Sequence, residues 1–408
     1  MKGIGHGWGR VPWDWESRRR WLDLPFPEEE YRRRVDGVRR AAEGHGVDVV
    51  VVVGDAADKG TVRYLTNFEV LFGGHALVVV PLEDEPVLIS NSVMHGEPMH
   101  SGFWMTWVRD ARAVMSPRTG GTPGGLWAEL VGLLGERGHT RRVGVCGHGA
   151  LTELERRILE RLPDCQLVDV TQAVDDLQAI KSPAEVEMLR RSALAADAGI
   201  LAALAASTPG TPETVVAAEA ARAMYAAGAE DLVFLSVVAG PLSGFKHALP
   251  RERPMGEGEM VFLDMGCSVG GYLSDTSRCA VAGRPTDEQL DFLAAAERIE
   301  DTIFGRMKPG ATIGELAAEG QELADELGYG QYLYFRGHGI GTSTHVPPSF
   351  FPGSPVPFEP GMVYAFEPML VRQGFGTAVV ENVVHMTPDG AVSLNQCPKR
   401  WEPKHAAT

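Results

Sequence analysis

Four acidic residues in the C-terminal half of the chain lie within apolar segments. They are Asp264, Asp275, Glu367 and Glu381. Burying a carboxylate without a partner costs several kcal/mol of lost solvation. A single acid in such a setting is more often a solvated strand end or a member of a structural ion pair than a metal ligand. Four acids in matched pairs favour compensation by about four positive charges, which two divalent cations supply.

Three histidines flank these acids. His338 lies in the glycine-rich stretch Gly337–Gly341, His345 follows seven residues later, and His247 precedes Asp264 by seventeen residues. A lone histidine is usually structural, but imidazole beside carboxylates is typical of transition-metal sites. A phosphate-binding loop is the competing interpretation of the glycines. That interpretation fails because the stretch has neither phosphate-loop pattern and no helical run follows it.

Strand-like runs carry the four acids, over residues 260–265, 272–281, 363–370 and 378–386. If the first two runs form a hairpin, Asp264 and Asp275 can reach one face of it. The second pair of runs places Glu367 and Glu381 in a similar relation. We therefore predict that the site lies on two sheets, one from each half of a single domain.

A repeat with an offset of one hundred residues organises this domain. Thr208–Thr211 precedes a helix that ends near Gly228, and Lys308–Thr312 precedes one that ends near Gly328. Thr312, with a glutamate three residues later, is a capping-box candidate. Because strand-like runs follow each pair of helices, we predict an α+β domain with a pseudo-two-fold repeat and a site between its halves.

A domain boundary is predicted between residues 180 and 181. Ser182 suits a helix N-cap, Pro183 the first helical position and Glu185 the acid of a capping box. The helix that begins there is expected to run towards Ala206. Residues 181–408 are thus predicted to be the domain that carries the chemistry.

Residues 1–180 have a different pattern. Short β-branched runs at 47–53, 76–80 and 86–90 alternate with helix-like stretches at 27–43, 125–137 and 151–161. This alternation predicts an α/β domain. No cluster of metal-ligating or nucleophilic residues is evident in it, so we expect a role in packing or oligomerisation.

Composition excludes several classes of function. The formal net charge of −16 argues against nucleic acid or an anionic membrane as a partner. The longest strongly apolar run, Val47–Val53, is far too short to cross a membrane. Five scattered cysteines without a CxxC pair indicate neither a disulfide framework nor a thiolate zinc site. We therefore expect a cytoplasmic protein.

The motifs around the acids and histidines resemble the pita-bread metallopeptidase family. This family includes methionine aminopeptidase, aminopeptidase P, prolidase and the metal-free relative creatinase. The resemblance covers Lys181 to about Pro388. Arg63–Thr66 also resembles the N-terminal domain of the prolidase, aminopeptidase P and creatinase branch, which methionine aminopeptidases lack. The resemblance implies a homodimer formed through that domain.

Carried over residue by residue, the resemblance implies five metal ligands: Asp264, Asp275, His338, Glu367 and Glu381. It implies that Asp275 and Glu381 bridge two divalent ions. Asp264 would bind one ion, and His338 and Glu367 the other. Oxygen ligands with a single imidazole suit Mn, Co, Fe or Zn.

Three residues are candidates for catalytic roles. Two ions lower the pKa of a water molecule and polarise the scissile carbonyl. Glu367 is the candidate to carry the proton of that water towards the leaving amine. His247 and His345 match the two non-ligand histidines of the family, which implies hydrogen bonds to the substrate and to the tetrahedral oxyanion.

The chain departs from the aminopeptidase P and prolidase pattern around the substrate. Val379 occupies a position where these enzymes usually have an arginine, so a binder for the free carboxylate of a dipeptide is missing there. Tyr334 replaces a usual histidine, and Val346–Pro348 replaces an acid that usually follows the second histidine. Arg336 or Arg372 is a candidate to replace the lost cation.

Three functions compete. The first is a metal-dependent peptidase acting on Xaa-Pro or similar N-terminal bonds, with a small peptide as substrate. The second is a creatinase-like hydrolase of a small non-peptide amide or C–N bond, for which the altered substrate wall is the argument. The third is a non-catalytic binding protein of the same fold. The intact ligand set counts against the third.

Overall fold

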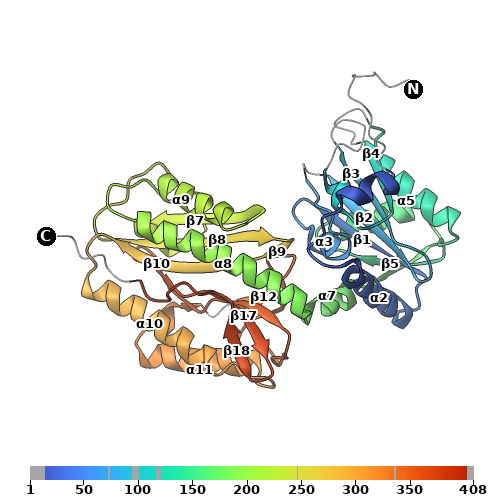
Figure 1. Cartoon of the computed structure of the whole chain (residues 1–408). Coiled ribbons are helices and arrows are strands. Elements are labelled where there is room, and N and C mark those ends of the chain that lie inside the picture. Colours follow the sequence, from blue (N-terminus) through green and yellow to red (C-terminus); the bar gives the residue numbers. More distant parts are fainter. Residues whose placement is uncertain are drawn as a thin grey trace, which may run out of the picture. The chain divides into compact units, whose positions relative to one another are not determined.

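The computed structural model describes residues 14–71, 74–93, 101–115, 121–245, 247–334 and 337–401 of the chain. The chain forms two compact units, Met1–Leu177 and Gln178–Thr408 (Figure 1). The division falls within helix α7 (Thr171–Ala179), close to the boundary predicted between residues 180 and 181. Among the described helices, none combines the length and apolar character needed to cross a bilayer.

The first unit contains a six-stranded mixed sheet in the order β4-β3-β2-β1-β5-β6. The antiparallel pairs are β1–β2 and β2–β3, and the parallel pairs are β1–β5, β3–β4 and β5–β6. Its strands are β1 (Val49–Asp55), β2 (His75–Pro81), β3 (Val87–Val93), β4 (Asp110–Met115), β5 (Arg142–Cys146) and β6 (Gln166–Asp169). Its other helices are α1 (Trp15–Arg18), η1 (Arg19–Trp21), α2 (Glu28–Gly44), α3 (Gly60–Thr66), α4 (Ser101–Met105), α5 (Gly125–Glu136) and α6 (Leu151–Leu159).

Helices cover both faces of this sheet, which explains the unbroken valine run of β1. Val49, Val51 and Val53 pack in one cluster with residues of α5 and α6. The intervening Val50 and Val52 are also fully buried, and α2 and α3 contact β1. A strand covered on both faces has no polar side, so its sequence does not alternate. The predicted α/β class of this region is confirmed.

The second unit contains two pairs of helices and three small sheets. Its helices are α8 (Pro183–Ala206), α9 (Glu213–Ala226), η3 (Gly240–Phe245), α10 (Asp287–Phe304), α11 (Ile313–Glu326) and η4 (Gly330–Tyr332). Its first sheet has the order β10-β8-β7, with β9 paired to β8. These strands are β7 (Asp231–Ala239), β8 (Glu259–Val269), β9 (Tyr272–Leu273) and β10 (Thr276–Ala282).

The other two sheets of this unit follow in sequence. One has three strands in the order β11-β15-β16, and one has five in the order β13-β12-β14-β17-β18. Their bounds are β11 (Leu333–Tyr334), β12 (Gly337–Gly339), β13 (Val346–Ser349), β14 (Val363–Phe366), β15 (Met369–Arg372), β16 (Gly376–Val379), β17 (Asn382–Thr387) and β18 (Gly390–Ser393).

Each helix pair packs against its own sheets (Figure 1). Residues of α8 and α9 share a buried cluster with β7, β8 and β10. Residues of α10 and α11 share another with β14, β15, β16 and β17. The sheets therefore lie between the two helix pairs, and this layered α+β arrangement confirms the predicted class of the C-terminal domain.

The predicted repeat is present in the helices. α9 and α11 have the same length, and their bounds differ by one hundred residues. Gly228 and Gly328 follow these helices with φ of 101° and 80°, a left-handed conformation that suits glycine. The capping boxes predicted at Ser182 and Thr312 are both formed, which confirms where α8 and α11 begin.

Candidate metal centre

Three of the four acids lie at interruptions of strands that the sequence predicts to be continuous. Asp275 separates β9 from β10, Glu367 separates β14 from β15, and Glu381 separates β16 from β17. At the last two breaks the chain passes between the three-stranded and the five-stranded sheet. The prediction of unbroken strands over 272–281, 363–370 and 378–386 is therefore wrong. Pro368, which has no amide hydrogen for a ladder, contributes to the second break.

Asp264 lies instead in the middle of a regular strand. β8 pairs with β9 and β10 as predicted, but Asp264 is opposite Ser277 of β10 and Ser236 of β7. Asp275 precedes β10 and is not its cross-strand partner. The hairpin is thus confirmed, while the two carboxylates approach each other through the irregular entry to β10.

Asp275, His338 and Glu381 form a buried cluster. One ligand atom of each lies within 4.8 Å of the others. The His338 Nε2 atom is 3.5 Å from Asp275 Oδ2 and 4.0 Å from Glu367 Oε1. The Ser277 hydroxyl connects Asp264 to this cluster, at 3.0 Å from Asp264 Oδ1 and 2.6 Å from Glu381 Oε2. All five residues predicted as ligands therefore lie around one point of the second unit.

The cluster is buried, and it has more carboxylates than cationic groups to neutralise them. Burial raises the pKa of Asp275 to about 6; the contact with His338 opposes this increase, and the charge of Asp264 adds to it. Burial, with the charges of neighbouring carboxylates, raises the pKa of Glu381 well above its ordinary value. The Ser277 hydroxyl has one proton, so it satisfies only one of the two carboxylates it contacts. Divalent cations fit this set, because they would neutralise the acids and use their oxygens as ligands.

The His338 ring is held from two sides. Its Nδ1 atom lies 3.1 Å from the carbonyl oxygen of Gly339, which directs Nε2 towards the carboxylates. Burial lowers the pKa of His338, but contact with Asp275 and the charges of Asp275 and Glu367 outweigh it, so the pKa is raised. A ligand with one nitrogen fixed by the backbone presents the other to a metal in a set direction.

His345 and His247, predicted to contact the substrate, lie beside this cluster. The rings of His345 and His338 are stacked with centroids 3.8 Å apart. Burial, together with the charges of His338 and His247, lowers the pKa of His345 to about 4, so its imidazole is neutral at pH 7. His247 Nδ1 is 3.2 Å from Asp264 Oδ2, and its ring meets the Phe262 ring edge-on. A largely exposed His247 is accessible to a substrate.

The positions that depart from the family pattern have well-defined surroundings. Val379 is 3% exposed and belongs to an apolar cluster with Phe262. Arg372 donates to Glu288 at 2.6 Å and lies over the Phe375 ring, so its guanidinium already has partners. The Tyr334 side chain is partly exposed. Arg336, the other predicted replacement cation, lies outside the described residues.

Sequence reasoning missed Ser277 and the buried Arg278. Ser277 could have been found, because the antiparallel register of a hairpin places it opposite Asp264. Arg278 is 1% exposed and donates to the carbonyl oxygen of Glu381 at 2.6 Å. No sequence signal distinguishes it from a solvated arginine near a strand end.

Comparisons with known proteins agree with this geometry. Residues 187–388 match the Metallopeptidase family M24, and residues 34–180 match the Creatinase/Prolidase N-terminal domain. A probable dipeptidase PepE of Mycobacterium tuberculosis is 32% identical over 230 residues, which cover 56% of this chain and 61% of that protein. The uncharacterized peptidase YqhT of Bacillus subtilis is 30% identical over 240 residues, covering 58% and 68%.

An Xaa-Pro dipeptidase of Pyrococcus furiosus is 29% identical over 229 residues, covering 56% of this chain and 66% of that protein. Among solved structures, the prolidase of Pyrococcus horikoshii superimposes with a TM-score of 0.76 at 22% identity, covering 90% of this chain and 99% of that one. The alignment with the mycobacterial relative spans less than two thirds of that protein's length. The likeness to the solved structure concerns the fold.

Proposed function

Because the chain belongs to metallopeptidase family M24, we propose that it is a metal-dependent peptidase that hydrolyses Xaa-Pro or similar N-terminal peptide bonds. The observation that carries this proposal is the buried cluster of Asp275, His338 and Glu381. The mycobacterial and archaeal relatives are named as a probable dipeptidase and an Xaa-Pro dipeptidase, which supports the choice of a small peptide as substrate.

The residues of the cluster suit two divalent ions of Mn, Co, Fe or Zn. In this proposal Asp275 and Glu381, the two carboxylates of the cluster with raised pKa values, would be shared by both ions. Asp264 would bind one ion, and His338 and Glu367 would bind the other. Such ions would activate a water molecule and polarise the scissile carbonyl.

The chain's own residues handle the proton and the substrate. Glu367 accepts the proton of the attacking water and passes it to the leaving amine. His345 is neutral at pH 7, so it has one N–H to donate to the developing oxyanion, an interaction worth about 3 kcal/mol. His247, exposed beside Asp264, positions the substrate.

A second candidate function is hydrolysis of a small non-peptide amide or C–N bond. Val379 favours it, because this side chain packs in an apolar cluster and cannot itself bind the carboxylate of a dipeptide. We also propose a homodimer formed through the first unit. A reducing, cytoplasmic location is compatible with five cysteines that are all buried and unpaired.

A hydrolysis screen distinguishes these functions. Metal-depleted protein is loaded with Mn or Co and offered Xaa-Pro dipeptides, longer Xaa-Pro peptides and small amides. We expect cleavage of Xaa-Pro peptides that depends on added metal and is absent in Asp275→Asn protein prepared in the same way. Cleavage of the amides alone selects the second function, and no metal-dependent cleavage of any group rejects both.

A further inference from the structure

The segment Cys397–Trp401, here called the C-terminal strap, contacts a buried arginine behind the cluster. Arg278 Nε donates to the carbonyl oxygen of Pro398 at 2.9 Å, and Arg278 Nη2 to that of Cys397 at 3.4 Å. Arg278 precedes these acceptors by about 120 residues in sequence. The strap therefore fixes one side of the guanidinium from a distant part of the chain.

The other side of the same guanidinium holds the backbone next to Glu381. Arg278 Nη1 donates to the carbonyl oxygens of Glu381 and Ser277 at 2.6 and 2.8 Å. Its Nη2 donates to Asn382 Oδ1 at 2.8 Å. The amide of Glu381 in turn donates to the carbonyl oxygen of Ser277 at 3.2 Å. Glu381 lies in a strand break without ladder partners of its own, so these bonds set its position.

Lys399 of the strap connects to Asn382 by a second route. Its Nζ atom donates to Glu300 Oε2 at 2.6 Å and to Asp301 Oδ1 at 2.7 Å. Glu300 is fully buried and accepts a hydrogen bond from Asn382 Nδ2 at 3.3 Å. A continuous polar chain thus runs from Lys399 through Glu300 and Asn382 to Arg278.

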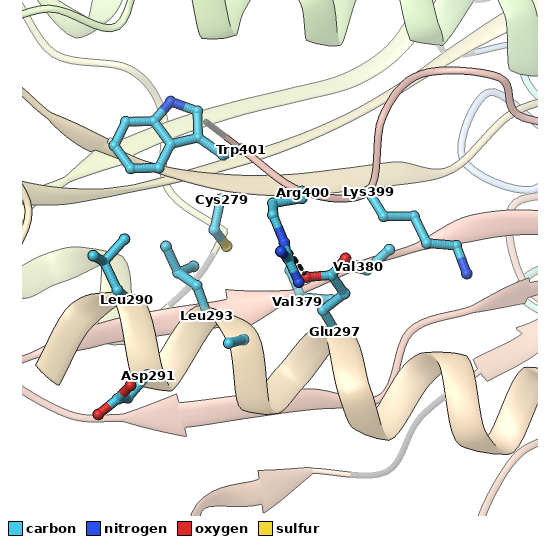
Figure 2. A pocket seen from close by; sticks show the side chains of 11 residues that line it. Cys279, Leu290, Asp291, Leu293, Glu297, Val379, Val380, Lys399, Arg400 and Trp401 are labelled. Carbon is cyan, nitrogen blue, oxygen red and sulfur yellow. Dashed lines mark hydrogen bonds and ion pairs between the residues drawn. The ribbon is translucent and has the colours of Figure 1, made fainter. Parts of the chain in front are cut away.

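The strap borders a pocket beside helix α10. This pocket of about 290 Å³ is lined by residues of α10, by Cys279, Val379 and Val380, and by Lys399, Arg400 and Trp401 of the strap (Figure 2). Three ion pairs join the strap to α10: Lys399 with Glu300 and with Asp301, and Arg400 Nε with Glu297 Oε2 at 2.9 Å. Figure 2 shows Lys399 and Arg400 beside each other above the helix. Cys397 and Trp401 pack against the hydrophobic clusters of this unit, and the ion pairs add a polar attachment between the strap and α10.

Among the contacts of the described residues, the ion pair of Lys399 with Glu300 is the one continuous with the candidate metal centre, through Asn382. We propose that Lys399 is a positioning residue for Glu381, acting through Glu300, Asn382 and Arg278, and that it thereby tunes metal affinity. The proposal rests on the metal-dependent function proposed above. Partners outside the ligand set typically change metal affinity 10- to 100-fold when removed.

The test compares two neighbouring substitutions, Lys399→Gln and Arg400→Gln. Lys399→Gln removes the ion pairs to Glu300 and Asp301, and Arg400→Gln removes the one to Glu297; of the described contacts, those lost in the first variant include the chain to Glu381. Metal-free proteins are titrated with Co²⁺ while binding is followed by calorimetry and by the visible absorption of the bound ion. We expect Lys399→Gln to weaken binding about tenfold and to shift the absorption spectrum. Arg400→Gln should match the wild type in both, and Lys399→Arg should restore them.

Lys399→Gln leaves the buried Glu300 without its cation, so the folded state of each variant is checked by circular dichroism. If Lys399→Gln does not fold, Arg278→Lys replaces it, because lysine keeps the charge but lacks the planar fork that reaches all five acceptors. The same weakening and spectral shift are expected of Arg278→Lys.

Three outcomes overturn the proposal in distinguishable ways. Wild-type affinity and spectrum in Lys399→Gln, or in Arg278→Lys where that variant is used, overturn the positioning role alone. Equal effects of Lys399→Gln and Arg400→Gln also overturn that role, because they indicate a general role of the strap in stability. Absence of Co²⁺ binding in the wild-type protein overturns the proposed function and the positioning role together.

Discussion

The two halves of the second unit share their helices but not their sheets. α9 and α11 have equal lengths, and each is followed by a left-handed glycine. The first half continues into the long regular strand β8, from which Asp264 projects. The second half divides into two short-stranded sheets, and both of its acids lie at the crossings. The helical repeat supplies a common scaffold, and strand breaks in both halves, at Asp275 in the first and at Glu367 and Glu381 in the second, place three of the four acids.

The largest expected effect comes from removing one acid of each half. Asp275→Asn and Glu381→Gln should each lower the hydrolysis rate by at least about a thousandfold, equal to about 4 kcal/mol of transition-state stabilisation. Equal losses would show that both halves are needed for the same centre. Turnover and metal content are measured on protein shown to be folded, and full activity in either variant contradicts the bridging role.

A smaller loss is expected for His345→Ala. This change removes one donor to the oxyanion, worth about 3 kcal/mol or a hundredfold in kcat. The metal content should stay at the wild-type value, because His345 is not among the proposed ligands. Elemental analysis alongside kinetics checks both points, and a metal-depleted His345→Ala protein would refute this assignment.

The stability of the metal-free protein should depend on the ionisation of Asp275. Its pKa is raised in the folded state from 3.8 to about 6, so the folded protein binds this proton more tightly than the unfolded chain. The contribution of Asp275 to stability is therefore favourable at low pH and is lost as pH rises from about 4 through 6. Asp275→Asn cannot ionise, so its melting temperature should exceed that of the wild type by more at pH 7 than at pH 4.

Thermal unfolding of both metal-free proteins across this pH range gives the measurement. Adding metal to the wild type should remove the difference, since the ions favour the charged carboxylates. A melting-temperature difference that is independent of pH would mean that ionisation of Asp275 does not destabilise the folded metal-free protein.

The smallest effects are expected at the glycines that the two halves share. Gly228→Ala and Gly328→Ala each place a β-carbon in a left-handed conformation, at a cost of about 1 kcal/mol. At both positions the added β-carbon would have open space around it, with no described atom beyond the adjoining residues within 4 Å, so the cost is conformational rather than steric. Chemical denaturation should show similar decreases in the free energy of unfolding for both variants, and kcat should be unchanged. Clearly unequal losses would indicate that the helical repeat is less symmetric in stability than in geometry.

The helices of the molecule could be predicted more accurately than its strands. Ser182 and Thr312 identify the starts of α8 and α11 because capping depends on local sequence. The breaks at Asp275, Glu367 and Glu381 could not be predicted from residue type, since apolar β-branched neighbours favour continuous strands. Whether a strand continues there depends on which sheet its next residues join, and this pairing is determined by tertiary structure rather than by local sequence.

The candidate site likewise contains residues that could be predicted from the sequence and residues that could not. The acids and histidines are conspicuous because they are polar residues in apolar runs, and resemblance to a family assigned them roles. Arg278 and Lys399 are not conspicuous, because arginine and lysine side chains are usually solvated. Their importance arises from acceptors more than ninety residues away in sequence.

The long sequence separation within the polar chain around Arg278 has a consequence for synthesis on the ribosome. Asp264 and Asp275 emerge well before Glu367 and Glu381. The acceptors of Arg278 in the strap, the carbonyl oxygens of Cys397 and Pro398, emerge later still. A nascent chain that lacks residues 397–399 has both early carboxylates. It lacks the strap contacts that hold the Arg278 guanidinium against the backbone of Glu381. Stable capture of metal should therefore follow, rather than guide, the folding of the first half.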